Sequence, residues 1–287
     1  MNKKVWMVAA VLFLMLTVGV GFQSEAAWQK LPNGNWRFTD ESARGYKIGW
    51  QEIDGKLYYF DPATGYRKTG WIPNGNTKRY CRPSDGSAVI SAWVKVGKYY
   101  YLNRRGNLVV NSFITTNGLT HYVGADGAMV AQKWVLVKGK YYYLNARGVM
   151  PRSTWVGNRY VNRYGVWVKD AVKCTDLELR YLAAITYLEA GNQPYQAKLG
   201  VANVVLNRVK DPRYPNNIIS VLYQPWQFEP AMTGSLDRLV NSNQEIQAQC
   251  MTAAKAAMTG TNNVPGCIGF DFGSNGIKYG VINFFKI

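Results

Sequence analysis

An aromatic residue returns about every 21 residues through the first half of the chain, and this period constrains the fold more than any other feature. Successive spacings are 22, 21, 22, 20, 21 and 21 residues. A unit this short can form only one supersecondary element, which cannot bury its apolar face alone, so neighbouring units must stack. The series consists of Trp28, Trp50, Trp71, Trp93, Phe113, Trp134 and Trp155.

Each repeat is predicted to be a β-hairpin. The clearest unit begins at Trp93 and has a short strand, a turn glycine at Gly97, three consecutive tyrosines and a second glycine at Gly106. The same order returns in residues 134–150. Glycine turns between short aromatic and β-branched runs are typical of hairpins. We therefore expect residues 28–170 to form a solenoid of stacked hairpins.

The aromatic side chains of the repeats have two interpretations. Most should form the core of the stack, but those at hairpin junctions can also make cages or platforms for sugar faces or quaternary ammonium groups. The unit resembles the cell-wall-binding repeats of bacterial surface proteins, the choline-binding and glucan-binding type. That resemblance implies wall contact by a set of junction aromatics: Trp50, Tyr58, Trp71, Trp93, Tyr99, Trp134 and Tyr141.

The first 27 residues are predicted to be a secretory signal peptide. Lys3 and Lys4 precede an apolar run over residues 5–22, and small residues follow at 24–27. This order is that of a cleaved export signal, with a retained membrane anchor as the alternative. We expect a secreted protein associated with the cell wall or the spore, without stable membrane association after cleavage and without a nucleic-acid partner.

Charge is concentrated in the repeats. The chain has a formal net charge of +17, of which residues 28–170 contribute +14 and residues 171–287 only +2. An excess of this size attracts polyanions. The expected partners are peptidoglycan and anionic or choline-bearing wall polymers.

Histidine and cysteine limit the available chemistry. His121 is the single histidine of the chain, so a zinc site built on several histidines is excluded. The four cysteines lack a C-x-x-C pair, which disfavours a zinc ribbon, and no metal or cofactor is expected. A disulfide between Cys250 and Cys267 and four free thiols both remain open. Hydrolytic chemistry should rest on carboxylates.

Residues 171–287 are predicted to form a compact, mainly α-helical (α+β) domain. A capping box at Thr175–Glu178 starts a helix that Gly191 ends. A second helix is expected from Pro194 to the prolines after Val209. Further predicted elements are a helix at 218–222, a long helix capped by residues 242–245 and running through Ala257, and strands at 268–272 and 279–285.

Glu189 is the candidate catalytic residue. It follows Leu182 and Ile185 at helical spacing, so it should share their apolar face, and it lies in the last turn, where the helix dipole disfavours negative charge. Both effects raise the pKa of a carboxyl group, as a general acid at a glycosidic oxygen requires. The alternative is an ordinary surface glutamate.

The sequence around Glu189 carries a second resemblance. Residues 185–209, 211–215, 223–228 and 280–285 resemble the spore cortex-lytic cell-wall hydrolase family, in order and over nearly all of 175–287. The resemblance implies cleavage of peptidoglycan glycan strands by a domain similar to lysozyme-like lytic transglycosylases, with Glu189 as the essential glutamate. Substrate-binding roles are expected for Asn207, Gln227 and Phe228, which could also be a capping amide, a turn amide and a core ring.

The expected reaction is cleavage after N-acetylmuramic acid, with Glu189 as acid and then as base. Simple hydrolysis would need a second carboxylate about 5 to 9.5 Å away. Two other functions remain open: an N-acetylmuramoyl-L-alanine amidase, which the scarcity of histidine disfavours, and a non-catalytic wall-binding protein. Candidates for the second carboxylate are Glu178, Glu229, Asp237 and Asp271.

Overall fold

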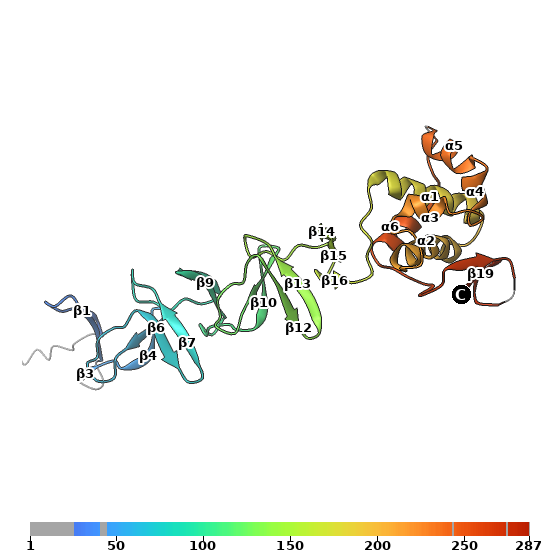
Figure 1. Ribbon diagram of the computed structural model, residues 1–287. Coiled ribbons are helices and arrows are strands. Elements are labelled where there is room, and N and C mark those ends of the chain that lie inside the picture. Colours follow the sequence, from blue (N-terminus) through green and yellow to red (C-terminus); the bar gives the residue numbers. More distant parts are fainter. Residues whose placement is uncertain (1–25, 41–44, 243, 274, 287) are drawn as a thin grey trace, which may run out of the picture. The chain divides into compact units, whose positions relative to one another are not determined.

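The computed structural model describes residues 26–40, 45–242, 244–273 and 275–286. The expected signal peptide, apart from its last two residues, lies outside the described residues. Antiparallel hairpins form the first part of the described chain, and a mainly helical domain with a small sheet follows, which confirms the predicted fold class (Figure 1).

The described chain separates into two compact units. One contains the residues up to 110 together with 125–128, and the other contains 111–124 together with 129–287. In a repeat array each repeat contacts only its neighbours. The boundary between two compact units can therefore fall between any two repeats. The domain boundary at 170–171 stays a prediction. No described helix is long and apolar enough to cross a membrane.

The repeat module, which we define as residues 28–168, consists of short strands joined by tight turns. At Asp54 and Gly55 the φ angles are 50° and 69°, the positive values of a two-residue hairpin turn. The strands are β1 (Trp28–Lys30), β2 (Trp36–Asp40), β3 (Gly45–Tyr46), β4 (Gly49–Ile53), β5 (Lys56–Phe60), β6 (Gly70–Asn74), β7 (Thr77–Cys81), β8 (Ala92–Val96), β9 (Lys98–Leu102), β10 (Ser112–Thr116), β11 (Leu119–Val123), β12 (Lys133–Val137), β13 (Lys140–Leu144), β14 (Thr154–Val156), β15 (Arg159–Val161) and β16 (Trp167–Val168).

One fully buried residue per hairpin marks the core of the repeat module. Backbone hydrogen bonds join successive hairpins inside each unit: the amide of Ala88 donates to the Leu57 carbonyl at 2.7 Å, and the amide of Met150 donates to the Thr120 carbonyl at 2.8 Å. Each hairpin therefore stacks on a neighbour, as the short period requires. The residues with 0 % exposure are Phe60, Cys81, Leu102, Val123, Leu144 and Val161.

The helical domain is built around α1, α2 and α6, whose apolar faces pack together. Thr175 and Glu178 form the predicted capping box at the start of α1. A sheet of order β17-β19-β18 packs beside α2. The elements are α1 (Asp176–Ala190), α2 (Tyr195–Lys210), α3 (Ile218–Leu222), α4 (Glu229–Met232), α5 (Ser235–Asn241), α6 (Ala248–Met258), β17 (Gly269–Asp271), β18 (Ile277–Tyr279) and β19 (Ile282–Phe285).

Three local features differ from the sequence prediction. Helix α6 begins at Ala248 with no side-chain cap, so the predicted cap at 242–245 is wrong. The single strand expected over 279–285 is two strands, because Gly280 adopts a φ of 63° and turns the chain between them. Helices α4 and α5 were not predicted from the sequence.

All four cysteines are free thiols, so the alternative of a Cys250–Cys267 disulfide is not realised. Three of them, Cys81, Cys250 and Cys267, are buried and serve as small apolar side chains in the packed interior.

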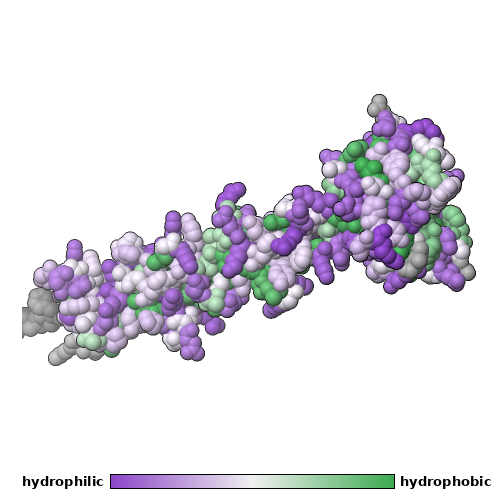
Figure 2. Space-filling view, viewed as in Figure 1, coloured by the Kyte–Doolittle hydropathy of each residue, from purple (hydrophilic) through white to green (hydrophobic). Residues whose placement is uncertain are grey.

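Over the visible face of the repeat module, hydrophilic side chains predominate, with small hydrophobic patches between them (Figure 2).

Candidate active site

Glu189 is the penultimate residue of α1. Leu182 and Ile185, on the same helix, are fully buried in the core, whereas Glu189 is half-buried at the edge of that face. The capping box fixes where α1 begins, and Gly191 follows its last residue. The helix thus carries one carboxylate from its buried side to the surface at its C-terminal end.

The electrostatic environment of Glu189 favours its protonated form. Burial, and to a smaller extent the negative charge of Glu229, raise the pKa of Glu189 to about 7. The C-terminal end of a helix opposes a negative charge as well. Among the described residues no side chain or backbone group donates a hydrogen bond to its carboxylate. Near neutral pH, Glu189 is therefore poised to give up and take back a proton.

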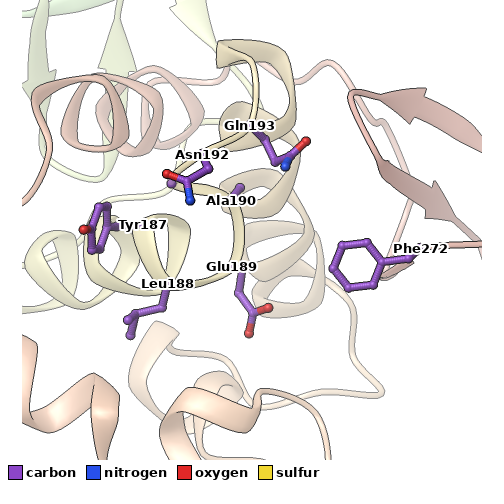
Figure 3. A pocket seen from close by; sticks show the side chains of 8 residues that line it. Tyr187, Leu188, Glu189, Ala190, Asn192, Gln193 and Phe272 are labelled. Carbon is purple, nitrogen blue, oxygen red and sulfur yellow. The ribbon is translucent and has the colours of Figure 1, made fainter.

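A cavity of about 340 Å³ lies against Glu189. Its walls come from the end of α1, from the turn between α1 and α2, and from Phe272, which directly follows β17 (Figure 3). The lining residues are Tyr187, Leu188, Glu189, Ala190, Gly191, Asn192, Gln193 and Phe272.

The sheet fixes one wall of this cavity. The side-chain oxygen of Gln193 accepts a hydrogen bond from the amide of Val281 at 3.2 Å, just beyond β18. A Cβ atom on Gly280 would lie 2.5 Å from that same oxygen and 2.9 Å from Pro194. Gly280 is therefore required both for its positive φ and for the close approach of the β18–β19 turn to the cavity wall.

The four candidates for a second carboxylate have different environments. Glu178 lies in the first turn of α1 and closes the capping box, about 16 Å along the helix from Glu189. Asp237 accepts hydrogen bonds from the hydroxyls of Tyr181 and Tyr223. Glu229 is exposed at the start of α4, and its negative charge raises the pKa of Glu189. Asp271 immediately precedes Phe272, which lines the cavity. Only Glu229 and Asp271 thus have a structural connection with the cavity.

The three expected substrate-binding residues do not line the cavity. The amide nitrogen of Asn207 donates to the carbonyls of Val264 and Cys267, so this buried side chain holds the loop before β17. Phe228 is 1 % exposed and belongs to the core, where it offers no surface to a glycan. Gln227 is exposed.

Two exposed rings of the helical domain were not predicted as site residues. Phe272 is 76 % exposed and lines the cavity. Trp226 is 85 % exposed and has a φ of 63°, a strained conformation for a bulky residue. It precedes Glu229, the residue whose charge acts on Glu189, by three positions. Strained backbone and exposed large rings are features that mark binding sites. A positive φ angle at a bulky residue leaves no trace in the hydrophobic periodicity of the sequence.

The expected wall-binding aromatics fall into three groups. Tyr99 and Tyr141 are each 44 % exposed, whereas Tyr58 is 7 % exposed and packs in the core against Trp28 at 4.8 Å between ring centroids. The partly exposed tryptophans each pack against a tyrosine of their own hairpin at 5.0 to 5.3 Å, as a cross-strand pair. These are Trp50, Trp71, Trp93 and Trp134.

No group of three histidine, cysteine, aspartate or glutamate side chains in the described ranges could hold a metal ion. Carboxylate chemistry is what the cavity at Glu189 offers.

The stability of the fold should depend on pH through Glu189. Its pKa is about 7 in the fold and 4.5 ordinarily, so the native state favours the protonated form, and the fold loses stability as pH rises between these values. Glu189→Gln should therefore stabilise the protein at pH 8 by about 1 to 3 kcal/mol and have almost no effect at pH 4. Urea unfolding at both pH values measures this difference, and an equal effect at both would contradict the raised pKa.

Comparisons with known proteins agree with both halves of the structure. Residues 192–274 match the family described as Cell Wall Hydrolase. Residues 47–93 match Choline-binding repeat, and residues 132–150 match Putative cell wall binding repeat. Glu189 lies three residues before the start of the Cell Wall Hydrolase match, so this match does not include it.

Two curated relatives cover different parts of the chain. A spore cortex-lytic enzyme of Bacillus subtilis is 34% identical over 59 residues, which are 21% of this chain and 19% of that protein. A glucosyltransferase-S of Streptococcus downei is 36% identical over 90 residues, 30% of this chain and 6% of that protein. The chain thus spans about a fifth of the length of the first relative.

Among solved structures, choline binding protein F of Streptococcus pneumoniae, crystallised in the presence of a peptidoglycan analogue, is 29% identical with a TM-score of 0.44. The alignment covers 50% of this chain and 47% of that one. The structure and the matched families define a modular protein in which hairpin repeats precede a helical domain with a carboxylate-bearing cavity. The chain carries a cell wall hydrolase domain related to spore cortex-lytic enzymes, preceded by choline-binding-type cell-wall repeats.

Proposed function

We propose that the protein is a secreted, wall-associated enzyme that cleaves the glycan strands of peptidoglycan at N-acetylmuramic acid. The observation that carries this proposal is Glu189, a half-buried carboxyl group with a pKa of about 7 at the edge of a cavity of about 340 Å³. The hydrolase domain match supports the substrate class. The repeats hold the enzyme on the wall, and their net charge of +14 favours anionic polymers.

In the proposed reaction Glu189 protonates the glycosidic oxygen of the leaving sugar. The carboxylate that results takes the proton of the 6-hydroxyl of N-acetylmuramic acid, and that oxygen attacks the anomeric carbon. The glycosidic bond breaks, an internal ether bond forms, and the proton returns to Glu189. The product is an anhydro-muramyl sugar, and neither water nor a second carboxylate takes part. A pKa near 7 suits a group that serves first as acid and then as base.

Mass spectrometry of the released wall fragments tests the proposal. Anhydro-muramyl ends support the single-carboxylate reaction. Reducing-end muramic acid would show hydrolysis instead and would direct attention to Glu229 and Asp271. Free stem peptides with intact glycan would show an amidase, and the absence of any fragment would show a wall-binding protein without activity.

The pH dependence of wall cleavage should follow the titration of Glu189. Activity should fall as pH rises above about 7, where the acid loses its proton before reaction. Glu229→Gln removes the negative charge that raises this pKa, so the alkaline limb should move to lower pH. The shift should be about half a unit or less, because burial is the larger cause. Glu245→Gln, an exposed residue before α6, is the control, and a limb that moves upward in Glu229→Gln would contradict this electrostatic assignment.

A further inference from the structure

A cavity in the repeat module gathers cationic side chains. It has a volume of about 730 Å³ and is formed by the hairpins β4–β5 and β6–β7 and by the turn after β9. Five of its lining residues are basic and two, Glu52 and Asp85, are acidic. The basic residues are Lys56, Arg79, Arg82, Arg104 and Arg105.

Two of these arginines occupy positions that recur along the repeats, and only Arg82 departs from the residue type usual at its position. Arg79 lies on the second strand of its hairpin, opposite the residue that follows the tryptophan of the first strand. Along the module, this position on the second strand alternates between tyrosine and a nitrogen-bearing side chain. Arg82 stands where four other repeats have an aspartate or asparagine whose side chain accepts the turn amides. The first series is Tyr58, Arg79, Tyr100, His121, Tyr142 and Arg159. The second is Asp61, Arg82, Asn103, Gly124, Asn145 and Asn162.

Arg79 and Arg82 are held in place by neutral acceptors. The Nε of Arg79 donates to the side-chain oxygen of Asn107 at 3.0 Å. The Nη1 of Arg82 donates to the Ser87 hydroxyl at 2.9 Å and to the Ala88 carbonyl at 3.2 Å. Neither arginine forms a salt bridge among the described residues, so their positive charges stay uncompensated at fixed positions.

The remaining charges leave the cavity cationic. Asp85 lies 3.5 Å from the Lys56 ammonium and accepts hydrogen bonds from Ser87, so its charge is already partnered. The guanidinium groups of Arg104 and Arg105 are exposed and have no acceptor among the described residues. Four arginines therefore line the cavity with at most one unpartnered carboxylate, that of Glu52, among its walls.

At several repeats, the aromatic faces already contact cations of the protein itself. The guanidinium of Arg79 lies 4.7 Å from the ring centroid of Trp50, and that of Arg159 lies 5.4 Å from both Trp134 and Trp167. The ammonium of Lys78 lies 4.5 Å from Trp71. A quaternary ammonium ligand that binds on the same ring face would have to displace these groups.

We propose that the cavity lined by Arg79, Arg82, Arg104 and Arg105 binds the oxyanions of an anionic wall polymer. Guanidinium groups pair in a two-pronged manner with phosphate or carboxylate oxygens, and an array of them can follow successive anionic groups of a polymer chain. The site does not depend on the catalytic proposal, because it lies wholly within the repeat module and uses none of the residues around Glu189.

The repeats supply a matched pair of variants. Arg104 and Arg105 follow Asn103 in a turn that Asn145 and Asn162 form in other repeats with the same side-chain hydrogen bonds. Arg104 corresponds to Ala146 and Arg163, and Arg105 corresponds to Arg147. The double variant Arg104→Ala/Arg105→Ala should therefore keep the turn. The control Arg147→Ala/Arg163→Ala removes two charges from the same turn positions outside the cavity.

The test measures binding of the full chain to inorganic polyphosphate and to polygalacturonate at about 0.15 M salt, near physiological screening. The parent should bind at least one polymer, and the Arg104/Arg105 variant should bind about tenfold or more weakly, as expected for lost charge-assisted hydrogen bonds. The Arg147/Arg163 control should change affinity by about twofold or less, the effect of net charge alone. Preference for polyphosphate identifies phosphodiester polymers as the source, and preference for polygalacturonate identifies glycan carboxylates.

Three results would overturn the proposal. One is an equal loss of affinity in both double variants, which would indicate diffuse charge attraction without a site. Another is displacement of the polymer by choline chloride beyond the effect of the same concentration of sodium chloride, which would indicate an ammonium-binding site. Absence of binding to both polymers would also refute it.

Discussion

Glu189→Gln should lower the rate of wall-fragment release by about 10²- to 10⁴-fold, the usual effect of losing a general acid, or further because the same group also serves as base. Glutamine keeps the size of the side chain in the cavity but has no proton to donate at this step. The fold should persist, since the buried carboxylate destabilises the protein at neutral pH. Binding to walls should also persist, because we propose that the repeats bear that function.

Glu245→Gln is the matched control for this experiment. It makes the same chemical change at an exposed glutamate before α6, and the cleavage rate should stay at the parent level. A folded Glu189→Gln protein with near-parent activity would remove Glu189 from the reaction. The amidase alternative would then have to be tested through the appearance of free stem peptides.

Local sequence signals predicted the framework that holds Glu189. The capping box between Thr175 and Glu178 set the start of α1, and the hydrophobic spacing of Leu182 and Ile185 set its buried face. Both signals act within two turns of a helix, where sequence spacing and spatial position correspond directly. The raised pKa of Glu189 followed from its place on that helix.

The rest of the cavity depends on contacts between residues distant in sequence. The charge of Glu229 acts on Glu189 across 40 positions, and Phe272 reaches the same cavity from the sheet. Periodicity within α1 contains no information about either residue. The turn at Gly280 was also missed, because its hydrophobic neighbours continue the pattern of a single strand through the turn.

The repeat period predicted the hairpins but not the individual role of each aromatic ring. Tyr58 and Tyr100 occupy equivalent register positions, and Arg79 occupies that position between them. The period determines backbone and register, whereas the identity of the residue at this position determines whether a tryptophan face meets a ring or a guanidinium group. A functional assignment based on the period alone therefore included Tyr58, which is buried.

Removing the two exposed rings of the hydrolase domain should weaken glycan binding by roughly 30-fold. Aromatic stacking contributes about 1 kcal/mol per ring, and a change of about 1.4 kcal/mol corresponds to tenfold in affinity. For Trp226 the suitable substitution is Trp226→Gly, because glycine accepts the φ of 63° without strain. Phe272→Ala removes the second ring, which lines the cavity at Glu189.

The double variant Trp226→Gly/Phe272→Ala should raise KM for soluble glycan fragments by that factor while kcat changes little, because a ring stacked on sugar contributes to binding and does not move protons. Leu177→Ala is the matched control: this side chain is 54% exposed and apolar, and it lies in the first turn of α1, at the opposite end of the helix from Glu189. A double variant with parent KM would show that the glycan does not lie across these rings. A large fall in kcat with unchanged KM would instead mean that they orient the sugar against Glu189, since losing an interaction made only in the transition state lowers kcat and leaves substrate binding unaltered.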